Sequence, residues 1–473
     1  MTGKREIFGP VLMHLGAVIR NDHLILSLLA LGVGAVAGVA VIGFREAVVF
    51  FQLSAFGTDT EHLYAEVMKL PWWRIVLVPT LGGLAIGILA HRFLPGQRPH
   101  GVSDVIEASA LHGGRMSGTT GFRAALVNAA SIGFGASVGR EGPAVHLGAS
   151  LGGVIAKRLH LNRTFARTLL GCGVAAAVAG SFNAPIAGAL FASEVVIGNY
   201  ALKAFAPIVI ASVTGTMISR AYFGDFPAFM LAEHDAISLM EFPAFIGLGL
   251  LTGLVATVFI RGTFWIGEKA ASSPFPAWSR PAFGGLAVGL IATVYPHVLG
   301  VGYGTMDTVL TGFFPVSLLI ALLIAKMAAS MISLGLGFGG GVFSPSLVIG
   351  AVLGAGYGVA VTTVAPGLSS GVEGYAIIGM GAMAAAVLGA PISTTLIVFE
   401  MTGDYTMTMA VMVTVVISSL VTGQIGGGSF FSLQLKGRGF DLHEGFERAL
   451  LRSLEVGRVM TFVGELAVRD LAL

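Results

Sequence analysis

The sequence predicts an all-α polytopic membrane protein whose chain contains two related halves, and three observations lead to this fold class. Hydrophobic residues make up 55% of the chain and charged residues only 11%, against about 25% charged residues in a typical soluble protein. Several apolar stretches reach the roughly 20 residues that a helix needs to cross a bilayer. Motifs rich in glycine and proline recur in the same order in both halves of the chain.

Apolar stretches follow one another along the whole chain and predict on the order of ten or more membrane segments. The stretches 24–44, 242–260 and 406–424 carry no charge and are long enough to span a bilayer. The others, some of them short, lie near 75–90, 123–138, 168–193, 203–219, 283–295, 316–334, 345–364 and 375–399. Several of these pieces are too short to cross a bilayer alone. We therefore expect tilted and broken helices among the full spans.

The first apolar stretch is interpreted as a membrane anchor. It continues to Phe44, beyond the ~7–15 residue core of a signal peptide, although Ala35-Val36-Ala37 resembles a cleavage site. Lys4, Arg5 and Arg20 precede it, and basic residues favour the cytoplasmic side. A multi-pass protein of the cell (inner) membrane with cytoplasmic termini is expected.

Composition also excludes several classes of function. The formal net charge is only +2, and no basic stripe beyond Lys436–Arg438 points to a nucleic-acid partner. Cys172 is the single cysteine, so an intrachain disulfide and a cysteine-based metal cluster are excluded. No cofactor or metal is expected. The 68 glycines favour close packing of membrane helices and breaks within them.

An internal repeat relates the two halves. GCGVAAAVAGSFNAPIAGALFASE ends at Glu194 and GMGAMAAAVLGAPISTTLIVFE ends at Glu400, and their Ala-Pro-Ile triplets share the same offset. Repeats of this kind are typical of transporters whose sites lie near the middle of the membrane. The predicted division is 1–22 for a cytoplasmic segment, 23–220 for the first repeat, 221–435 for the second and 436–473 for a charged cytoplasmic tail.

Each repeat contains a glycine-rich loop that runs into a proline and then an apolar helix: 139–143 in the first and 339–345 in the second. Proline in the first turn marks a helix N-terminus. Its exposed N–H groups and the positive end of the helix dipole together form an anion site. The alternative is that the glycines only allow tight packing. Partial charges hold an anion weakly enough to let it leave, as conduction requires.

Charges inside apolar sequence are candidate functional residues. Glu141 can occupy an anion site itself and leave it when protonated, or form a structural ion pair with Arg140. Glu194 and Glu400 each end an apolar helix, and capping or pairing is their favoured role. Lys326 lies in an apolar run, where it snorkels or caps a helix end. His146 is interpreted as a buried histidine with its hydrogen bonds satisfied, although it can relay protons.

Three motifs together resemble the CLC family of chloride channels and chloride/proton antiporters, in particular its bacterial members: GREGP, GGGVFSP and FNAPIAGALF. The resemblance covers about 23–431. It implies inverted repeats and a homodimer with one pore in each subunit. It also implies that Glu141 is the gating glutamate and that N–H groups of Val342 and Phe343 hold the anion. The full expected anion-binding set is His100, Gly101, Arg140, Gly142, Gly341, Val342, Phe343 and Phe431.

The chain departs from the family pattern at three positions. His100 stands where a serine offers its hydroxyl to the anion; it either donates an N–H, adds charge at low pH, or points away. Val195 follows Glu194 at the inner proton-transfer position, where exchangers have a glutamate. Phe431, with Phe430 as an alternative alignment, replaces a tyrosine. These changes predict weaker anion binding at the centre and looser coupling.

The expected function is transport of chloride or similar small anions across the lipid bilayer, channel-like or weakly coupled to protons. A tightly coupled chloride/proton antiporter is the main alternative. Transport of another anion such as fluoride or nitrate, a carrier of an organic solute, and an intramembrane enzyme using Ser137 and His146 are more remote. Val456–Thr461 faintly resembles the start of a CBS module, so the tail is a possible beginning of one.

Overall fold

A computed structural model describes residues 22–198, 202–225, 239–311, 314–367 and 369–440. The predicted cytoplasmic segment 1–22, apart from its last residue, and the tail from 441 lie outside this range. The described chain is almost entirely helical and contains no β-strand. The first half comprises α2 (Asp22–Phe56), α3 (Leu63–Val67), α4 (Trp72–Phe93), η1 (Pro95–Gln97), α5 (Val102–Ala110), α6 (Gly118–Gly133), α7 (Glu141–Arg158), α8 (Arg163–Phe182), α9 (Pro185–Phe191), η2 (Ala192–Ile197) and α10 (Leu202–Phe223).

The described part of the second half is helical as well. It comprises η3 (Leu239–Glu241), α11 (Phe242–Ala271), η4 (Ala277–Ser279), α12 (Arg280–Val294), η5 (Pro296–Val298), α13 (Tyr303–Leu310), α14 (Val316–Gly335), α15 (Phe343–Val364), α16 (Gly371–Leu388), α17 (Pro391–Thr402), α18 (Tyr405–Val421), η6 (Thr422–Gly426) and α19 (Phe430–Lys436). The predicted boundary after residue 220 falls within the last turn of α10.

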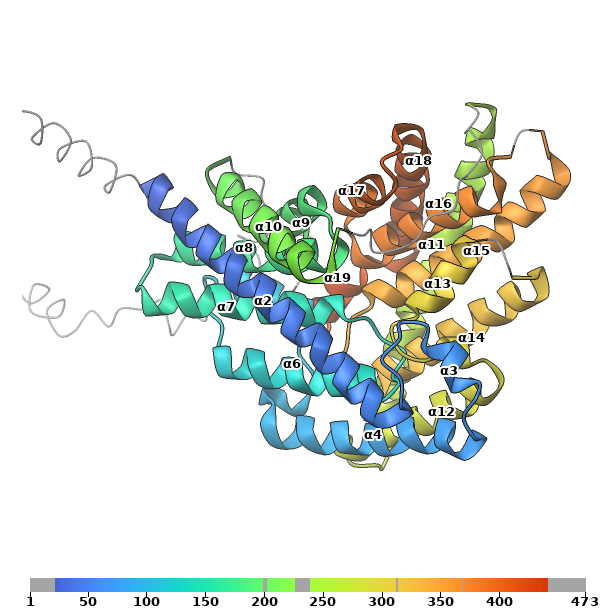
Figure 1. Cartoon of the computed structure of the whole chain (residues 1–473), viewed down its shortest axis with the longest axis horizontal. Helices are drawn as coiled ribbons and strands as arrows, with labels where there is room; N and C mark the ends of the chain where they lie inside the picture. Colours follow the sequence, from blue (N-terminus) through green and yellow to red (C-terminus); the bar gives the residue numbers. More distant parts are fainter. Residues whose placement is uncertain (1–21, 199–201, 226–238, 312–313, 368, 441–473) are drawn as a thin grey trace, which may run out of the picture.

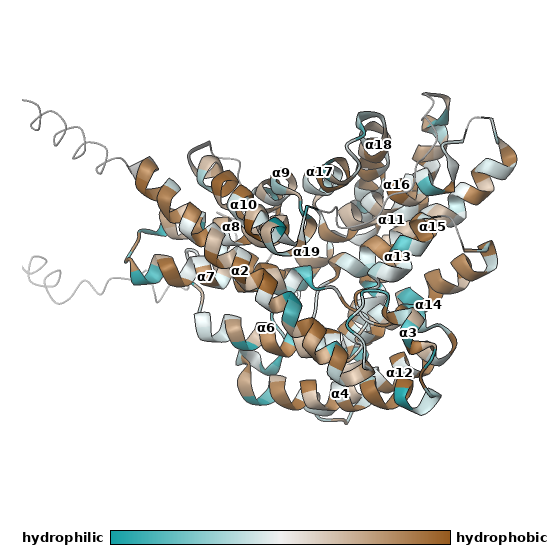
Figure 2. Cartoon of the chain, in the orientation of Figure 1, coloured by the Kyte–Doolittle hydropathy of each residue, from teal (hydrophilic) through white to brown (hydrophobic). Residues whose placement is uncertain are grey.

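Nine helices in the described ranges are long and apolar enough to cross a membrane. Apolar residues run along α4 and α12 at the edge of the molecule (Figure 2). Many large apolar side chains there are exposed, such as Leu81 and Leu290, because a helix in a bilayer turns part of its apolar surface toward lipid. The predicted all-α polytopic membrane fold is confirmed.

Three of the predicted apolar stretches do not form single helices, in line with the broken helices that we expected. The stretch 168–193 divides between α8 and α9, and the stretch 375–399 divides between α16 and α17. Both breaks fall at Ala-Pro, after Asn183 and Gly389 in the left-handed conformation. Proline lacks the N–H that would continue a helix. The stretch 123–138 is helical only to Gly133, because the chain then turns into the glycine loop before α7.

The two glycine loops meet at the centre of the molecule. Gly139 and Gly341 exchange both backbone hydrogen bonds, at 2.7 and 2.8 Å, in an antiparallel bridge. From there α7 and α15 run away from one another (Figure 1). A Cβ on Gly341 would lie 3.0 Å from the Gly142 nitrogen, so a larger residue would push the two loops apart. The inverted arrangement of the repeats thus brings two helix N-termini to one place.

A glutamate from each repeat also caps the start of a helix in the other repeat. The Glu400 carboxylate accepts the N–H groups of Ile186 and Ala187 at 2.9 and 2.7 Å, at the start of α9. The Glu194 carboxylate accepts those of Ile392 and Ser393 at 3.0 and 2.8 Å, at the start of α17. Each glutamate therefore stabilises the N-terminus of the matching helix in the other repeat. The capping role expected for both residues is confirmed.

Lys326 caps a helix as well. Its side chain is buried within α14, and its Nζ donates to the carbonyls of Val298 and Gly300 at 3.0 and 3.1 Å. These carbonyls close η5 and the turn before α13, so the lysine fixes the segment that leads to Tyr303. Of the two roles expected for Lys326, the structure shows capping.

Candidate functional site

A cavity of about 220 Å³ opens where the two repeats meet, and we call it the large cavity. Eight of the expected functional residues line it: His100, Gly101, Glu141, Gly142, Gly341, Val342, Phe343 and Phe431. They come from both repeats and from α19 near the end of the described chain. The structure therefore brings most of the candidate site together at the junction of the two glycine loops.

The N-termini of α7 and α15 both open into the large cavity. The first N–H groups of a helix have no acceptor within the helix, and the positive end of the helix dipole adds to them. The first i to i−4 bonds here are from Ala144 to Arg140 and from Ser346 to Val342. The Gly341 N–H already donates to Gly139, so Val342 and Phe343 are the better placed donors for an anion.

Glu141 closes the large cavity at one end. The residue is only 1% exposed. Its carboxylate accepts a hydrogen bond from the Tyr303 hydroxyl at 2.5 Å and another from the Ser344 hydroxyl. Tyr303 begins α13 and Ser344 lies in the first turn of α15. Residues from two other helices thus hold the carboxylate in one position.

Tyr303, which donates to Glu141, also lines a second cavity of about 40 Å³, which we call the small cavity. Arg45, Glu61, Arg140 and Tyr303 are among its lining residues. Arg140 does not line the large cavity, contrary to its expected place in the anion-binding set. The Arg140 guanidinium stacks over the Tyr303 ring, 4.4 Å from the ring centroid. The same group points toward Glu61, to which it donates a hydrogen bond.

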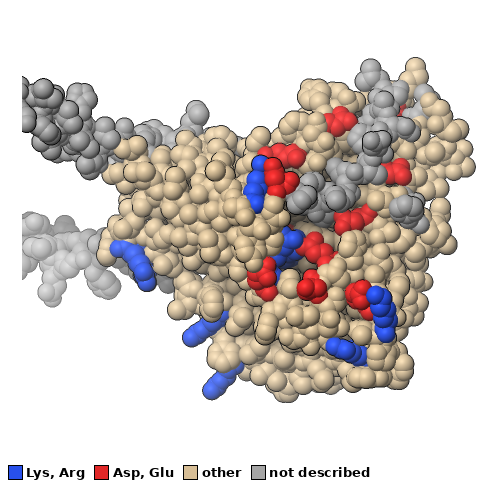
Figure 3. Space-filling model, viewed as in Figure 1, with Lys and Arg blue, Asp and Glu red and all other residues tan. Residues whose placement is uncertain are grey.

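Glu61 joins the two arginines of the small cavity. Its Oε1 accepts from Arg140 at 3.0 Å and from Arg45 at 2.6 Å. Burial alone would raise the pKa of this carboxyl, but the charges of Arg140 and Arg45 outweigh burial and lower the pKa from 4.5 to about 2. Charged side chains gather near the middle of the face in Figure 3, while most of the surrounding surface is uncharged.

Because the pKa of Glu61 is lowered on folding, its ion pairs stabilise the protein above pH 4.5, and this contribution is lost as the pH falls toward 2. We expect Glu61→Gln to lower the free energy of unfolding at pH 7 by ~1 kcal/mol or less, since the pairs are partly exposed to solvent. The difference from the unmodified protein should shrink between pH 4.5 and 2. Thermal unfolding in detergent across this range measures the difference.

The control for this prediction is Glu66→Gln, which breaks only the exposed Glu66–Lys69 pair. An equal effect of both changes on the free energy of unfolding at pH 7 contradicts the prediction.

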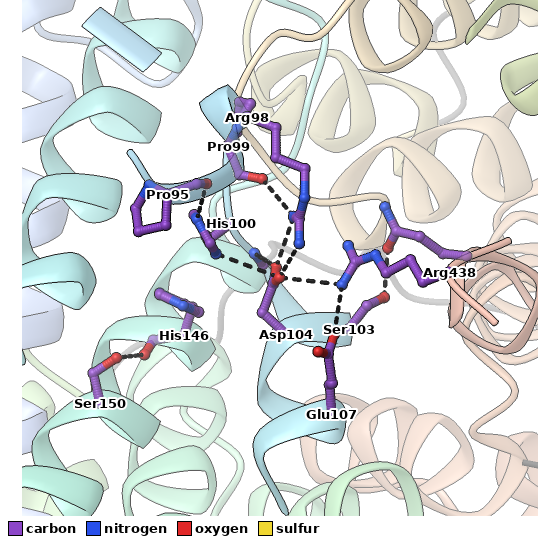
Figure 4. A network of polar contacts seen from close by, with 12 residues as sticks. Pro95, Arg98, Pro99, His100, Ser103, Asp104, Glu107, His146, Ser150 and Arg438 are labelled. Atoms are coloured by element: carbon purple, nitrogen blue, oxygen red, sulfur yellow. Dashed lines mark hydrogen bonds and ion pairs between the residues drawn. The ribbon is translucent and has the colours of Figure 1, made fainter. Parts of the chain in front are cut away.

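The His100 ring points toward Asp104 (Figure 4). Its Nδ1 lies 3.3 Å from the Asp104 carboxylate and its Nε2 lies 3.1 Å from the Pro95 carbonyl. Its ring also packs against His146, with centroids 5.5 Å apart. With both ring nitrogens engaged, the geometry favours the third alternative for His100, in which the side chain points away from the anion.

Asp104 is the centre of this polar network. It accepts hydrogen bonds from Arg98 at 2.5 Å and from Arg438 at 3.1 Å. Burial alone would raise the pKa of the Asp104 carboxyl, but the hydrogen bonds from His100 and Arg98 hold the pKa well below its usual value. Arg438 also reaches Glu107 at 3.2 Å. The network ties α5 to the segment after α19, at the end of the large cavity opposite Glu141.

Phe431 and Phe430 both line the large cavity, so either alignment places an aromatic ring without a hydroxyl there. Glu194 and Val195 line neither cavity. Glu194 is instead bound to the start of α17, and Val195 packs against the main hydrophobic core from η2. No hydrogen bond joins Ser137 to His146. Ser137 pairs with Ser330 at 3.0 Å, and no cluster that could hold a metal occurs within the described ranges.

Several residues of the site had no clear signal in the sequence. Tyr303 lies in the short motif VGYGT and Glu61 in an ordinary polar loop. Ser344 belongs to GGGVFSP, but the motif does not show that its hydroxyl reaches Glu141. Flanking glycines around Tyr303 were the one available hint, because they are typical of a tightly placed helix start.

The fold and the site together define a polytopic membrane protein of two inverted repeats, with a cavity where the repeats meet. The family described as "Voltage gated chloride channel" matches residues 82–423. The "Putative chloride channel protein ClcB-like" of Ralstonia nicotianae is 33% identical over 413 residues, which cover 85% of this chain and 95% of that protein. The "Voltage-gated ClC-type chloride channel ClcB" of Escherichia coli O81 (strain ED1a) is 30% identical over 418 residues, or 85% and 97% of the two chains. The chain belongs to the CLC family, whose members transport anions.

Solved structures show the same fold. A slow cyanobacterial Cl⁻/H⁺ antiporter aligns with a TM-score of 0.77 at 24% identity, covering 90% of this chain and 98% of that one. A CLC-type fluoride/proton antiporter aligns with a TM-score of 0.72 at 22% identity, covering 87% and 97%. At this identity the likeness extends to the fold alone.

Proposed function

We propose that this protein carries chloride or similar small anions through one pathway in each subunit, with Glu141 as the gate, in a channel-like or weakly proton-coupled manner. The observation that carries the proposal is the position of Glu141. Its buried carboxylate lines the large cavity beside two helix N-termini and bonds Tyr303, which lines the small cavity. An anion moving from one cavity to the other has to displace it.

Protonation is the step that releases the gate. The ionised carboxylate occupies the positive environment that the N-termini of α7 and α15 create, as an anion would. When it is neutral it loses the charge that holds it there, and an anion takes its place. Weak partial charges, rather than a full side-chain charge, then allow the anion to leave again.

Weak coupling follows from what surrounds the anion deeper in the large cavity. The His100 ring is engaged by Asp104 and Pro95, and Phe431 has no hydroxyl to donate. Val195 cannot carry a proton. An anion at the centre is then held mainly by backbone N–H groups, and a weakly occupied centre favours slippage between anion and proton movement.

A tightly coupled chloride/proton antiporter is the second candidate. It is favoured by Glu141 itself, which supplies a proton acceptor on the pathway, and by the slow Cl⁻/H⁺ antiporter among the structural neighbours. Coupling would then require another proton path past Val195, through water or another side chain.

We further infer a homodimer in the inner membrane, formed through the face of α9, α17 and α18. Ile186, Ile392, Tyr405 and Met412 are each about half or more exposed on these helices, and an apolar groove of about 400 Å³ lies between α17 and α18. With cytoplasmic termini, the large cavity beside α19 opens to the cytoplasm and the small cavity to the outside.

Purified protein in chloride-loaded liposomes tests the proposal. We expect chloride to leave when a counter-ion path is provided, with bromide and nitrate also passing. Fluoride efflux, measured in parallel, tests the alternative that the protein transports fluoride. Liposomes that keep their chloride, with protein shown to be folded and inserted, contradict the proposed function.

A further inference from the structure

We propose that the hydroxyl groups of Tyr303 and Ser344 form a latch that positions Glu141 and holds the gate closed, an inference that rests on the proposed function. Both hydroxyls donate to the same carboxylate, one to each oxygen: Tyr303 to Oε1 and Ser344 to Oε2. Tyr303 is 2% exposed and Ser344 is fully buried. The two are positioning residues, since they act through Glu141.

The hydrogen bond from Tyr303 crosses the wall between the two cavities. Glu141 lines the large cavity, while Tyr303 lines the small one. Opening a path between the cavities therefore requires this bond to break. Ser344 adds a second donor from α15, so two helices of the second repeat hold a carboxylate that belongs to the first.

Tyr303 is itself fixed in place. Gly302 precedes it in the left-handed conformation, with φ of +92°, and starts α13. The Arg140 guanidinium covers one face of the ring, and Glu61 holds Arg140. Lys326 holds the turn from Val298 to Gly300 just before. A tyrosine held in this way donates its hydroxyl in one direction, toward Glu141.

The latch also fits the distribution of hydroxyl groups along the pathway. The two positions expected to present a side-chain hydroxyl to the anion in the large cavity carry His100 and Phe431. The hydroxyls nearest the pathway instead bind the gate. Hydrogen bonds to a charged group are stronger than neutral ones, so these donors favour the closed, ionised state of Glu141 over the open one.

A double-mutant cycle distinguishes a latch from a merely structural hydrogen bond. We expect Tyr303→Phe to raise the rate of chloride efflux from liposomes at neutral pH about tenfold, which corresponds to ~1.4 kcal/mol. Ser344→Ala should raise it several-fold. In the Glu141→Ala background the same two changes should alter efflux less than twofold, because the group that the hydroxyls hold is gone.

Matched controls are available in the chain. Tyr357→Phe removes a hydroxyl that lines neither cavity and bonds the Ala244 carbonyl, and Ser346→Ala removes one that bonds its own helix at Val342. Neither should change efflux. The latch is contradicted if Tyr303→Phe and Ser344→Ala leave efflux unchanged, or if they raise it equally with and without Glu141. If Tyr303→Phe does not fold, the Ser344→Ala cycle decides.

The failure of the latch and the failure of the proposed function give different results. If Glu141→Ala behaves like the unmodified protein, the gate is wrong and the latch falls with it. If Glu141→Ala accelerates efflux but Tyr303→Phe and Ser344→Ala do not, the gate stands and only the latch is wrong.

Discussion

Glu141→Ala is expected to raise chloride efflux at neutral pH by at least about tenfold, since the charge-assisted hydrogen bonds it removes are worth ~1.5–3 kcal/mol each. The change also removes the group whose protonation opens the pathway. Efflux should therefore lose most of its dependence on pH. Chloride release from liposomes, measured with an electrode at a series of pH values, gives both quantities.

Glu141→Gln separates charge from volume. The amide has nearly the same size but is neutral at every pH, so it resembles the protonated gate. We expect its efflux to lie between that of the unmodified protein and that of Glu141→Ala, with little pH dependence. A strong pH dependence that survives in both variants would show that another group controls opening.

The second large effect is expected at the crossed caps. Removing the carboxylate in Glu194→Ala or Glu400→Ala leaves two N–H groups at the start of α17 or α9 without their acceptor. We expect each change to cost about 2 kcal/mol of unfolding free energy, at the upper end of the range for a helix cap. Because the caps join the two repeats and lie at the proposed dimer face, the dimer should weaken as well.

Thermal unfolding in detergent and cross-linking of the dimer measure these two effects. Glu66→Ala is the control, since Glu66 pairs only with the exposed Lys69. The caps are shown to be unimportant if Glu194→Ala and Glu400→Ala unfold at the same temperature as that control.

The sequence predicted the features that depend on local chemistry. Glycine followed by proline identified the starts of α7 and α15, and the repeated Ala-Pro-Ile triplets identified the matching halves. The ends at Glu194 and Glu400 were correctly interpreted as capping positions. Each of these features depends on residues close together in the chain, or on a pattern that occurs twice.

Features that depend on side-chain direction could not be predicted. Arg140 is adjacent to Glu141 in sequence, yet its guanidinium points to Glu61 in a distant loop. His100 aligns with an anion-binding position, yet its ring turns to Asp104. Tyr303 reaches Glu141 only because α13 begins beside α7 and α15. Such contacts are set by tertiary packing, which the spacing of residues in the sequence does not reveal.

The central claim is that anions pass a glutamate gate without tight proton coupling, and one measurement tests it most directly. Chloride and proton movements are recorded together in liposomes that carry an outward chloride gradient and no imposed proton gradient. We expect rapid chloride efflux with little or no uphill proton uptake. Proton uptake in fixed proportion to chloride efflux, driven against its own gradient, would contradict the account and establish the coupled antiporter instead.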